Sequence, residues 1–437
     1  MKMASIGIGL MGLGVVAGQV AKILSDDNKV KLLSDAVGRP LTLRKIKVID
    51  ADLSRPLVKE LNPNLITTDE EEFFNTPGLN IIVEAIGGEN PPFHYQKRAL
   101  SARKYVVTSN KEVIAKHGVE LWSLAQQNNV GLYYEASVGG GIPIIVPLQR
   151  DLIANTIQSI HAIINGTTNY ILTHMASEGM DFSLALNKAQ ELGYAEANPR
   201  NDIEGIDATY KLAILASLAF HCQVKPEDVY CEGISKLTSR DFQYANELGF
   251  AVKLLAIGKQ QEKAIQVRVH PVFIPDNTLL AEVDGVFNAI EIEGDLVGKL
   301  LFYGRGAGAF PTSSAVISDI VAAAKDVVCG AVAGSGWKIE PGKSIKPMSE
   351  LETRYYLRME VADQPGVLAQ ISRVLGDNLI SIYSVIQKEA NDITHTAEIV
   401  IMTHFAREAA MQQALLILKT LPIVKQINNF VRVEDIK

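Results

Sequence analysis

Two charged side chains lie one helical turn apart at the start of an otherwise apolar segment. Asp207 and Lys211 are spaced i, i+4, so they project from one face of a helix that continues through Leu212–Ala216. Charges on a buried helix are costly unless they pair or face a polar cavity. The pattern therefore favours a polar cavity at this helix face. The alternative is a surface ion pair, which would add little stability.

Further charged residues lie near this pair or at a predicted strand end. Glu196, Asp202 and Glu204 come just upstream of it, in a loop that contains a proline. A second lysine, Lys111, follows the predicted strand 104–109. The carboxyl ends of strands in an open α/β sheet face the ligand crevice, so Lys111 either reaches a substrate or begins a helix as a solvated residue.

A glycine-rich turn opens the chain. Two registers fit a dinucleotide-binding fingerprint, Gly7-x-Gly9-x-x-Gly12 or Gly12-x-Gly14-x-x-Ala17. The second is physically better, because its glycines follow the strand and open a helix whose free N–H groups favour a pyrophosphate. A purely structural turn is one alternative. A signal peptide or membrane span in the uncharged stretch 3–21 is another, which the density of glycines disfavours.

The second predicted strand, 46–50, would supply the contact to the adenosine ribose. Asp50 or Asp52 at its end can accept a hydrogen bond from the ribose, which favours NAD. Arg55, close by, can instead pair with the 2′-phosphate of NADP. An insertion over about 25–44 must be looped out to bring these residues to the turn. The choice between NAD and NADP stays open.

The elements that must position these residues predict three folded parts. Residues 1–135 alternate short apolar runs and helical patterns, which predicts parallel βαβ units. A second, α+β domain is expected over about 139–306. The helical segment 314–326 is expected to pack back on the first domain, and glycines at 334–336 with Glu340–Lys343 to mark a linker. The strands expected in the first part are 4–11, 46–50, 80–87, 104–109 and 130–136.

Residues 353–437 read as a separate small unit with the order strand, helix, strand, strand, helix, strand. This βαββαβ order is that of a ferredoxin-like sandwich. The predicted elements are strands 355–361, 380–386, 394–402 and 424–432, and helices 367–375 and 408–419.

Composition restricts the class of protein. Of 437 residues, 47% are hydrophobic and 21% charged, which excludes a collagen-like, low-complexity or disordered chain. A net charge of −7 gives no basic field, so we expect neither nucleic-acid nor membrane partners. The three cysteines are too few for a disulfide scaffold and read as reduced thiols of a cytoplasmic protein.

Together these motifs closely resemble the homoserine dehydrogenase family over nearly the whole chain. The most specific part is residues 189–211, AQELGYAEANPRNDIEGIDATYK, which fits the family signature without a departure. Asn165–Tyr170 and Ser109–Lys111 also match, as does the stretch from Gly306 to Thr312. The small departures are Ala17, where many relatives have glycine, and Ala51, where an arginine often occurs.

The resemblance implies an activity and a division into domains. The reaction would be the reversible NAD(P)H-dependent reduction of L-aspartate 4-semialdehyde to L-homoserine, in the branch leading to threonine, methionine and isoleucine. A Rossmann-type nucleotide-binding domain would span 1–138, completed by about 307–335. An α+β substrate-binding and dimerisation domain would span 139–306, a linker 336–352, and a regulatory domain 353–437.

The resemblance also implies residue roles. Lys211 would be the general acid in reduction, Lys111 would lie beside the nicotinamide and the substrate oxygen, and Glu196 and Asp207 would hold the substrate's ammonium. An ordinary lysine is a ready acid but a poor base at pH 7, so oxidation should need alkaline pH. The cofactor, NADP or NAD, would be bound by Gly12, Leu13, Gly14, Val15, Asp50, Ile86, Gly87, Ser109, Lys111 and Gly308.

Two further sites follow from the resemblance. A sodium ion would bind backbone oxygens of Glu135, Val138, Gly140 and Ile142; the glycines here could equally serve as a hinge. The C-terminal unit resembles an ACT domain, marked by residues 363–368 and 376–382. Threonine would be its effector, with Gly366 and Asn378 in the site, although a purely dimerising module is the alternative. A homodimer or homotetramer is expected.

Two rival functions remain at this stage. One is a different semialdehyde or amino-acid dehydrogenase on the same scaffold, and the other is a non-catalytic amino-acid sensor. The intact set of Glu196, Asp207 and Lys211 argues against the sensor. An acylating aldehyde dehydrogenase would need a nucleophilic cysteine in a strand-end motif, and the three cysteines lie elsewhere.

Overall fold

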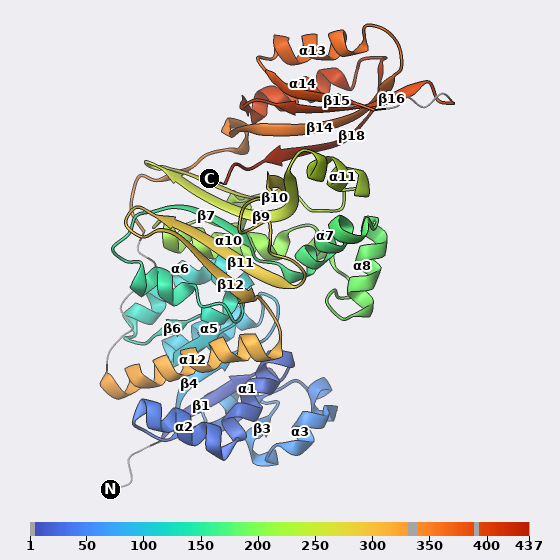
Figure 1. The fold of residues 1–437 in the computed structure, drawn as a ribbon. Helices are drawn as coiled ribbons and strands as arrows, with labels where there is room; N and C mark the ends of the chain where they lie inside the picture. The colour runs from blue at the N-terminus through green and yellow to red at the C-terminus, as the bar shows by residue number, and fades with distance from the viewer. Residues whose placement is uncertain (1–4, 331–336, 338, 389–392, 437) are drawn as a thin grey trace. The chain divides into compact units, whose positions relative to one another are not determined.

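The computed structural model describes residues 5–330, 337, 339–388 and 393–436. The chain divides into two compact units, each made of several segments (Figure 1). Unit 1 comprises residues 1–160, 210–229 and 287–343, and unit 2 comprises 161–209, 230–286 and 344–437. None of the helices in the described ranges combines the length and apolar character of a membrane span. The glycines expected to form a linker at 334–336 lie outside the described residues.

Unit 1 contains a six-stranded parallel sheet with the strand order β3-β2-β1-β4-β5-β6. This order places the ends of β1 and β4 side by side, where the strand order reverses, and a nucleotide binds at such a point in doubly wound folds. The apolar run Ile81–Val83 is buried, as a strand covered on both faces requires. The strands are β1 (Ile6–Met11), β2 (Leu41–Lys47), β3 (Ile66–Thr67), β4 (Leu79–Glu84), β5 (Tyr105–Thr108) and β6 (Leu132–Tyr133).

Helices connect these strands. The prediction that the segment 314–326 packs on the first domain is confirmed, since α12 (Ala309–Cys329) contacts α1 (Val15–Ser25) and β4, and Figure 1 shows it alongside them. A hairpin of β11 (Phe287–Gly294) and β12 (Gly298–Arg305) precedes α12. The remaining helices are α2 (Asp27–Val37), α3 (Pro56–Glu60), α4 (Glu70–Phe74), α5 (Pro92–Ser101) and α6 (Lys111–Gln127).

The sequence placed the ends of three strands of this sheet wrongly. The strand predicted to reach residue 87 ends at Glu84, since the Ile86 N–H bonds the Glu84 side chain and not a neighbouring strand. The second strand ends at Lys47 instead of Asp50, because the expected insertion is ordered as α2 and the strand starts earlier. The last strand is only Leu132–Tyr133, because the chain then bends into a 3₁₀ turn at Glu135–Ser137. The stretch whose alternative was a signal peptide forms β1 and α1, and its side chains at Ala17, Val20 and Ala21 are buried.

Unit 2 combines helices with a mixed sheet. Its long strands β9 (Phe250–Gln261) and β10 (Ala264–Pro275) pair antiparallel, and the short β8 (Tyr230–Cys231) and β13 (Ser344–Ile345) run parallel to β10. Two elements, β7 (Ile157–Ile163) and α10 (Ile206–Ala219), pass along the chain from one unit to the other. The helices of this part are α7 (Gly166–Glu178), α8 (Phe182–Glu191), α9 (Arg200–Ile203) and α11 (Ser239–Glu247).

The C-terminal part of unit 2 has the predicted βαββαβ order. Its antiparallel sheet has the order β18-β14-β16-β15, as in a ferredoxin-like sandwich, with a short β17 (Ala406–Arg407) on β14. A core of its own includes Tyr355, Leu357, Ile371 and Met411. Its last strand also pairs with β10, at Arg432 and Val433. The elements are β14 (Glu352–Ala362), α13 (Val367–Asp377), β15 (Ile382–Gln387), β16 (Thr396–Thr403), α14 (Glu408–Leu418) and β18 (Val424–Val433).

Candidate active site

The glycine-rich turn has the geometry of the second register. Gly7 and Gly9 lie inside β1, where added Cβ atoms would meet Gly78 O at 2.0 Å and Phe73 at 2.7 Å, so packing explains them. Gly12 follows the strand with φ +91°, and a Cβ there would lie 2.9 Å from Ala85 O. Gly12 is therefore the glycine that the turn into α1 requires, and Gly14 is the N-cap of that helix.

The N-terminus of α1 is open for an anion. Gly14 caps the helix with no side-chain hydrogen bond, and an added Cβ there would meet nothing within 4 Å. Free N–H groups and the helix dipole favour a phosphate at such an end. Val15, the first helical residue, is exposed. This end of the helix therefore has the free space and the N–H groups that an anion requires.

The ribose side of the turn is occupied by Arg55. Its guanidinium donates to Leu13 O at 3.2 Å and pairs with Asp52 at 2.6 Å. Asp50 is exposed in the 3₁₀ helix Asp50–Ser54 rather than at a strand end, so the sequence misjudged its position. Arg55 is therefore fixed beside the glycine-rich turn, next to one of the two candidate carboxylates.

The ends of β4 and β5 are joined by Asn110. Its side-chain amide donates to Ile86 O at 3.0 Å and Gly88 O at 2.8 Å, while its oxygen caps α6 by accepting from the Val113 N–H at 3.1 Å. The Ser109 backbone N–H donates to Glu84 O at 3.4 Å. One buried side chain thus holds the 86–88 loop next to Lys111.

The Glu84 side chain also holds the 86–88 loop. Its buried carboxylate accepts from the Ile86 N–H at 2.6 Å and from Gln96 and Thr108 at 2.6 and 2.7 Å. Burial raises the pKa of Glu84, and these hydrogen bonds only partly oppose that shift. Sequence reasoning missed both Glu84 and Asn110, although Asn110 lies inside the Ser109–Lys111 motif that it singled out.

Lys111 is the first residue of α6 and is half-buried. A cation at a helix N-terminus opposes the helix dipole, so this lysine does not serve the helix that it begins. Helical stability therefore gives no reason for a lysine at position 111, and its role at the cofactor stays a prediction.

The predicted lysine–carboxylate pair is buried. Lys211 and Asp207 lie on α10 and are 7% and 4% exposed, which removes the surface ion pair as an explanation. Asn165, the cap of α7, donates to Asp207 at 2.9 Å and to Asp202 at 2.7 Å. The structure thus brings Asp202, Asp207 and Asn165 together. The role of Asn165 was missed, although it starts one of the motifs noted in the sequence.

Glu196 is placed differently. Its side chain is exposed, in the loop before α9, and Gln190 donates to its backbone carbonyl at 3.0 Å. The structure does not bring Glu196 into the cluster of Asp202, Asp207 and Asn165 by a recorded side-chain contact. Its substrate-binding role stays a prediction.

The loop predicted to hold sodium has a backbone that only glycine permits. Gly139 and Gly140 have φ +73° and +56°, and a Cβ on Gly140 would lie 2.3 Å from Gly306 O. The Glu135 carboxylate accepts the N–H groups of Ile144, Ile145 and Val146 at 2.5 to 2.8 Å. The Glu135 side chain therefore organises the loop, which leaves backbone carbonyls as the donors for a hard cation.

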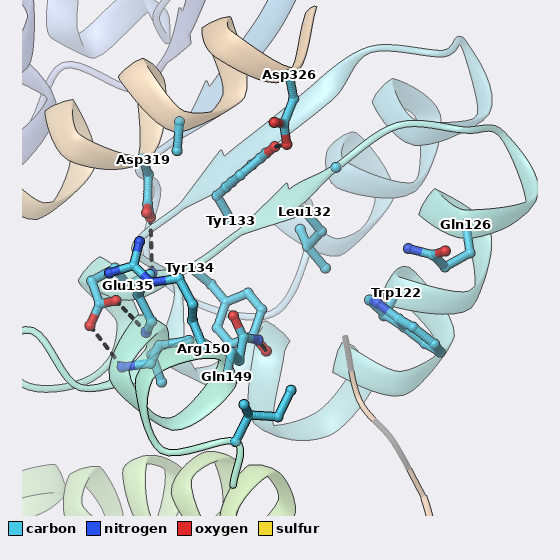
Figure 2. Close-up of a pocket in the computed structure, with 15 residues that line it drawn as sticks. Trp122, Gln126, Leu132, Tyr133, Tyr134, Glu135, Gln149, Arg150, Asp319 and Asp326 are labelled. Carbon is cyan, nitrogen blue, oxygen red and sulfur yellow. Dashed lines mark hydrogen bonds between the residues drawn. The ribbon is translucent and has the colours of Figure 1, made fainter. Parts of the chain in front are cut away.

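A cavity of about 600 Å³ is lined by Glu135 together with residues of α6, β6 and α12 (Figure 2). Asp319, at its wall, accepts the Glu135 N–H at 2.9 Å, and its pKa is raised well above the usual range by burial and by the Glu135 charge. Tyr133 donates to Asp326 at 2.5 Å. The lining includes neither the glycine-rich turn nor Lys111 or Lys211, so this cavity is separate from the predicted cofactor site.

Comparisons with known proteins match every part of this architecture. The model of the homoserine dehydrogenase NAD-binding domain matches residues 12–135, that of homoserine dehydrogenase matches 143–321, and that of the ACT domain matches 355–422. A homoserine dehydrogenase of Corynebacterium glutamicum is 41% identical, over 99% of this chain and 96% of its own length.

The chain belongs to the homoserine dehydrogenase family.

Solved structures agree. A homoserine dehydrogenase from Thiobacillus denitrificans has a TM-score of 0.91 at 39% identity, covering 99% of this chain and 98% of its own. A hyperthermophilic archaeal homoserine dehydrogenase in complex with NADPH has a TM-score of 0.61 at 30% identity, covering 73% of this chain and 97% of its own. This homoserine dehydrogenase is thus an NAD(P)-dependent oxidoreductase with a C-terminal ACT domain, as the sequence predicted.

Proposed function

We propose that this dehydrogenase interconverts L-aspartate 4-semialdehyde and L-homoserine, with Lys211 as the proton donor and acceptor. The observation that carries the proposal is the buried pair of Lys211 and Asp207 on α10, with Asp207 held by Asn165. A buried ammonium on an apolar helix needs a polar surrounding, and a substrate oxygen completes one.

In the reductive direction, a nicotinamide cofactor would, when bound, provide the hydride that reduces the aldehyde carbon. The oxygen of that carbonyl gains charge as the hydride arrives. Lys211 hydrogen-bonds this oxygen and donates its proton to it, and it takes the proton back in the oxidative direction. Lys211 must lose a proton before it can accept one, so reduction should run at neutral pH and oxidation should be favoured at alkaline pH.

The acidic residues orient the substrate. Asp207, positioned by Asn165, and Glu196 would bind the substrate's ammonium group. Lys111 would lie beside the nicotinamide and the substrate oxygen, because the Asn110 bridge fixes the start of α6 against the 86–88 loop. Holding the substrate and the catalytic side chain in a fixed orientation lowers the activation free energy of the reaction.

The cofactor would bind across the ends of β1 and β4. The open N-terminus of α1, with Gly12, Leu13, Gly14 and Val15, would take the pyrophosphate, and Ile86, Gly87, Ser109, Lys111 and Gly308 would line the nicotinamide end. Arg55, fixed at Leu13 O, offers a cation to a 2′-phosphate. We therefore expect the enzyme to accept NADP(H), in line with the archaeal relative solved with NADPH. Asp50 would instead accept a hydrogen bond from the ribose of NAD.

A sodium ion would be held by carbonyl oxygens of Glu135, Val138, Gly140 and Ile142, which lie in one glycine-dependent loop. Its contribution would be to fix this loop, next to the Gly306–Gly308 turn that Gly140 touches. Among the described residues, no group of three or more His, Cys, Asp or Glu side chains forms an alternative metal site.

Threonine is the proposed effector of the ACT domain, and a homodimer or homotetramer the proposed assembly. Gly366 has φ +87° and caps α13 without a side chain, which leaves the helix N-terminus open to a carboxylate. Asn378 ends the same helix and donates to Val374 O at 2.8 Å. Loss of activity at millimolar threonine would support the regulatory role. Undiminished activity without binding would leave the purely dimerising module.

The assay follows nicotinamide absorbance with homoserine or aspartate semialdehyde, with NAD and NADP in parallel. Turnover with homoserine at alkaline pH supports the proposal. Turnover only with another amino alcohol would indicate a different dehydrogenase, and absence of turnover together with threonine binding would indicate a sensor. The same assay with each cofactor settles the preference for NAD or NADP.

A further inference from the structure

Arg432, on the last strand of the ACT domain, has partners in two parts of unit 2. Its side chain is 3% exposed. Within the ACT domain it donates to both carboxylate oxygens of Glu408, at 2.6 and 2.9 Å, at the start of α14. Outside the ACT domain it donates to Glu232 at 2.9 Å and to the Tyr230 hydroxyl at 3.2 Å. One guanidinium therefore joins the ACT domain to the segment at β8.

Both the backbone and the side chain of Glu232 have hydrogen-bond partners. The Glu232 N–H donates to Val269 O on β10 at 2.8 Å, and the Tyr230 hydroxyl donates to the Glu232 carboxylate at 3.1 Å. The Arg432 guanidinium also lies over the Tyr230 ring, 5.0 Å from its centroid. Buried, bidentate Arg–carboxylate pairs fix geometry as well as charge.

The turn after Glu232 packs directly on the loop that precedes α10. The Ile234 N–H donates to Ile203 O at 2.8 Å, and the Cys231 thiol donates to Glu204 O at 3.0 Å. Gly233 is so close that an added Cβ would lie 2.3 Å from Ile203 O. A shift of the 231–234 turn must therefore move the backbone at 203–205.

That backbone carries the acidic substrate site. Asp202 lies one residue before Ile203, and Asp207 two residues after Gly205, and both accept from Asn165. The contacts thus run without a break from Glu408 through Arg432 and Glu232 to the turn, and from the turn to Asp202 and Asp207.

We propose that Arg432 and Glu232 are positioning residues for the substrate site: their ion pair holds the 231–234 turn, and the turn holds the loop that carries Asp202 and Asp207. Neither residue touches the substrate. The inference rests on the proposed function, because it assigns the substrate's ammonium to Asp207. The Arg432–Glu232 ion pair would therefore affect substrate binding. The ACT domain contributes the Arg432 guanidinium, on which the position of Asp202 and Asp207 depends.

The test uses the full-length enzyme with Glu232→Gln, which keeps the size of the side chain and removes its charge. The expected result is a rise of about tenfold in KM for homoserine, about 1.4 kcal/mol of binding, with kcat and the KM for NADP changed less than twofold. Gly233→Ala, which pushes on Ile203 O directly, should raise the same KM without touching the ion pair. Glu247→Gln is the matched control, since the Glu247–Lys388 pair, 2.6 Å apart, also joins the ACT domain to the rest of unit 2, but both of its side chains are 44% exposed.

The results distinguish failure of this inference from failure of the proposed function. If both Glu232→Gln and Gly233→Ala keep the wild-type KM for homoserine, the inference is wrong, even if the melting temperature falls. If Glu247→Gln raises this KM as much as Glu232→Gln does, the effect is a general one of charge and the inference is also wrong. If the wild-type enzyme does not oxidise homoserine with either cofactor, the proposed function itself fails.

Discussion

Replacing Asn110 with serine tests how the cofactor loop is held. Asn110 donates to Ile86 O and Gly88 O and caps α6 at the Val113 N–H. Serine caps a helix as well as asparagine does but is too short to reach the two carbonyls. Each lost hydrogen bond contributes about 1 kcal/mol, so the 86–88 loop loses up to about 2 kcal/mol of restraint.

If the cofactor needs this loop in its observed position, that loss raises the KM for NADP by up to about 30-fold. Asn110→Ala is the matched variant, because it also removes the cap and should lose about 1 kcal/mol more of unfolding free energy with no further change in KM. Initial rates against cofactor concentration and urea unfolding measure the two effects. A wild-type KM in Asn110→Ser would refute the claim that this bridge shapes the cofactor site.

Three further predictions concern stability, the sodium loop and the cofactor. Burial alone would raise the pKa of Glu434, but Arg268, His161 and Lys259 hold this pKa well below the usual range. The ionised carboxylate therefore stabilises the fold above about pH 4.5, and this stabilisation is lost as the pH falls. Glu434→Gln should therefore lower the unfolding free energy by about 3 kcal/mol at pH 7 and by less below pH 4, measured by denaturant titration. In the wild type, sodium chloride should give a higher melting temperature than choline chloride. Gly140→Ala should abolish this difference, because the added Cβ collides with Gly306 O. An unchanged difference in the variant would contradict a sodium site in this loop. Arg55→Ala should raise the KM for NADP several-fold and leave that for NAD unchanged, and equal effects on both would contradict the 2′-phosphate contact.

Much of the fold was predictable because it depends on local pattern. The glycine register followed from requiring glycines after the strand, and Gly12 at φ +91° agrees. The burial of Lys211 followed from the apolar run behind it. The ACT-like unit followed from its order of elements, each found within a few residues of its predicted bounds.

What the sequence did not predict depends on contacts between distant residues. Asp50 was misplaced because the spacing from the glycines gave no sign that the insertion folds as α2. The bridge by Asn110 joins residues 22 and 24 positions apart, and Asn165 reaches Asp207 across 42 positions. Arg432 and Glu232 are 200 positions apart. No periodicity or spacing rule encodes such pairs, because they arise only when the sheets form.

The rate of homoserine oxidation by Lys211→Met tests the central claim most directly, since methionine fills the same space without a proton to exchange. The account predicts a fall in kcat of about 100- to 10,000-fold, with NADPH still bound at the wild-type affinity in a fluorescence titration. Turnover at the wild-type rate in this variant would contradict the assignment of Lys211 as the proton donor and acceptor.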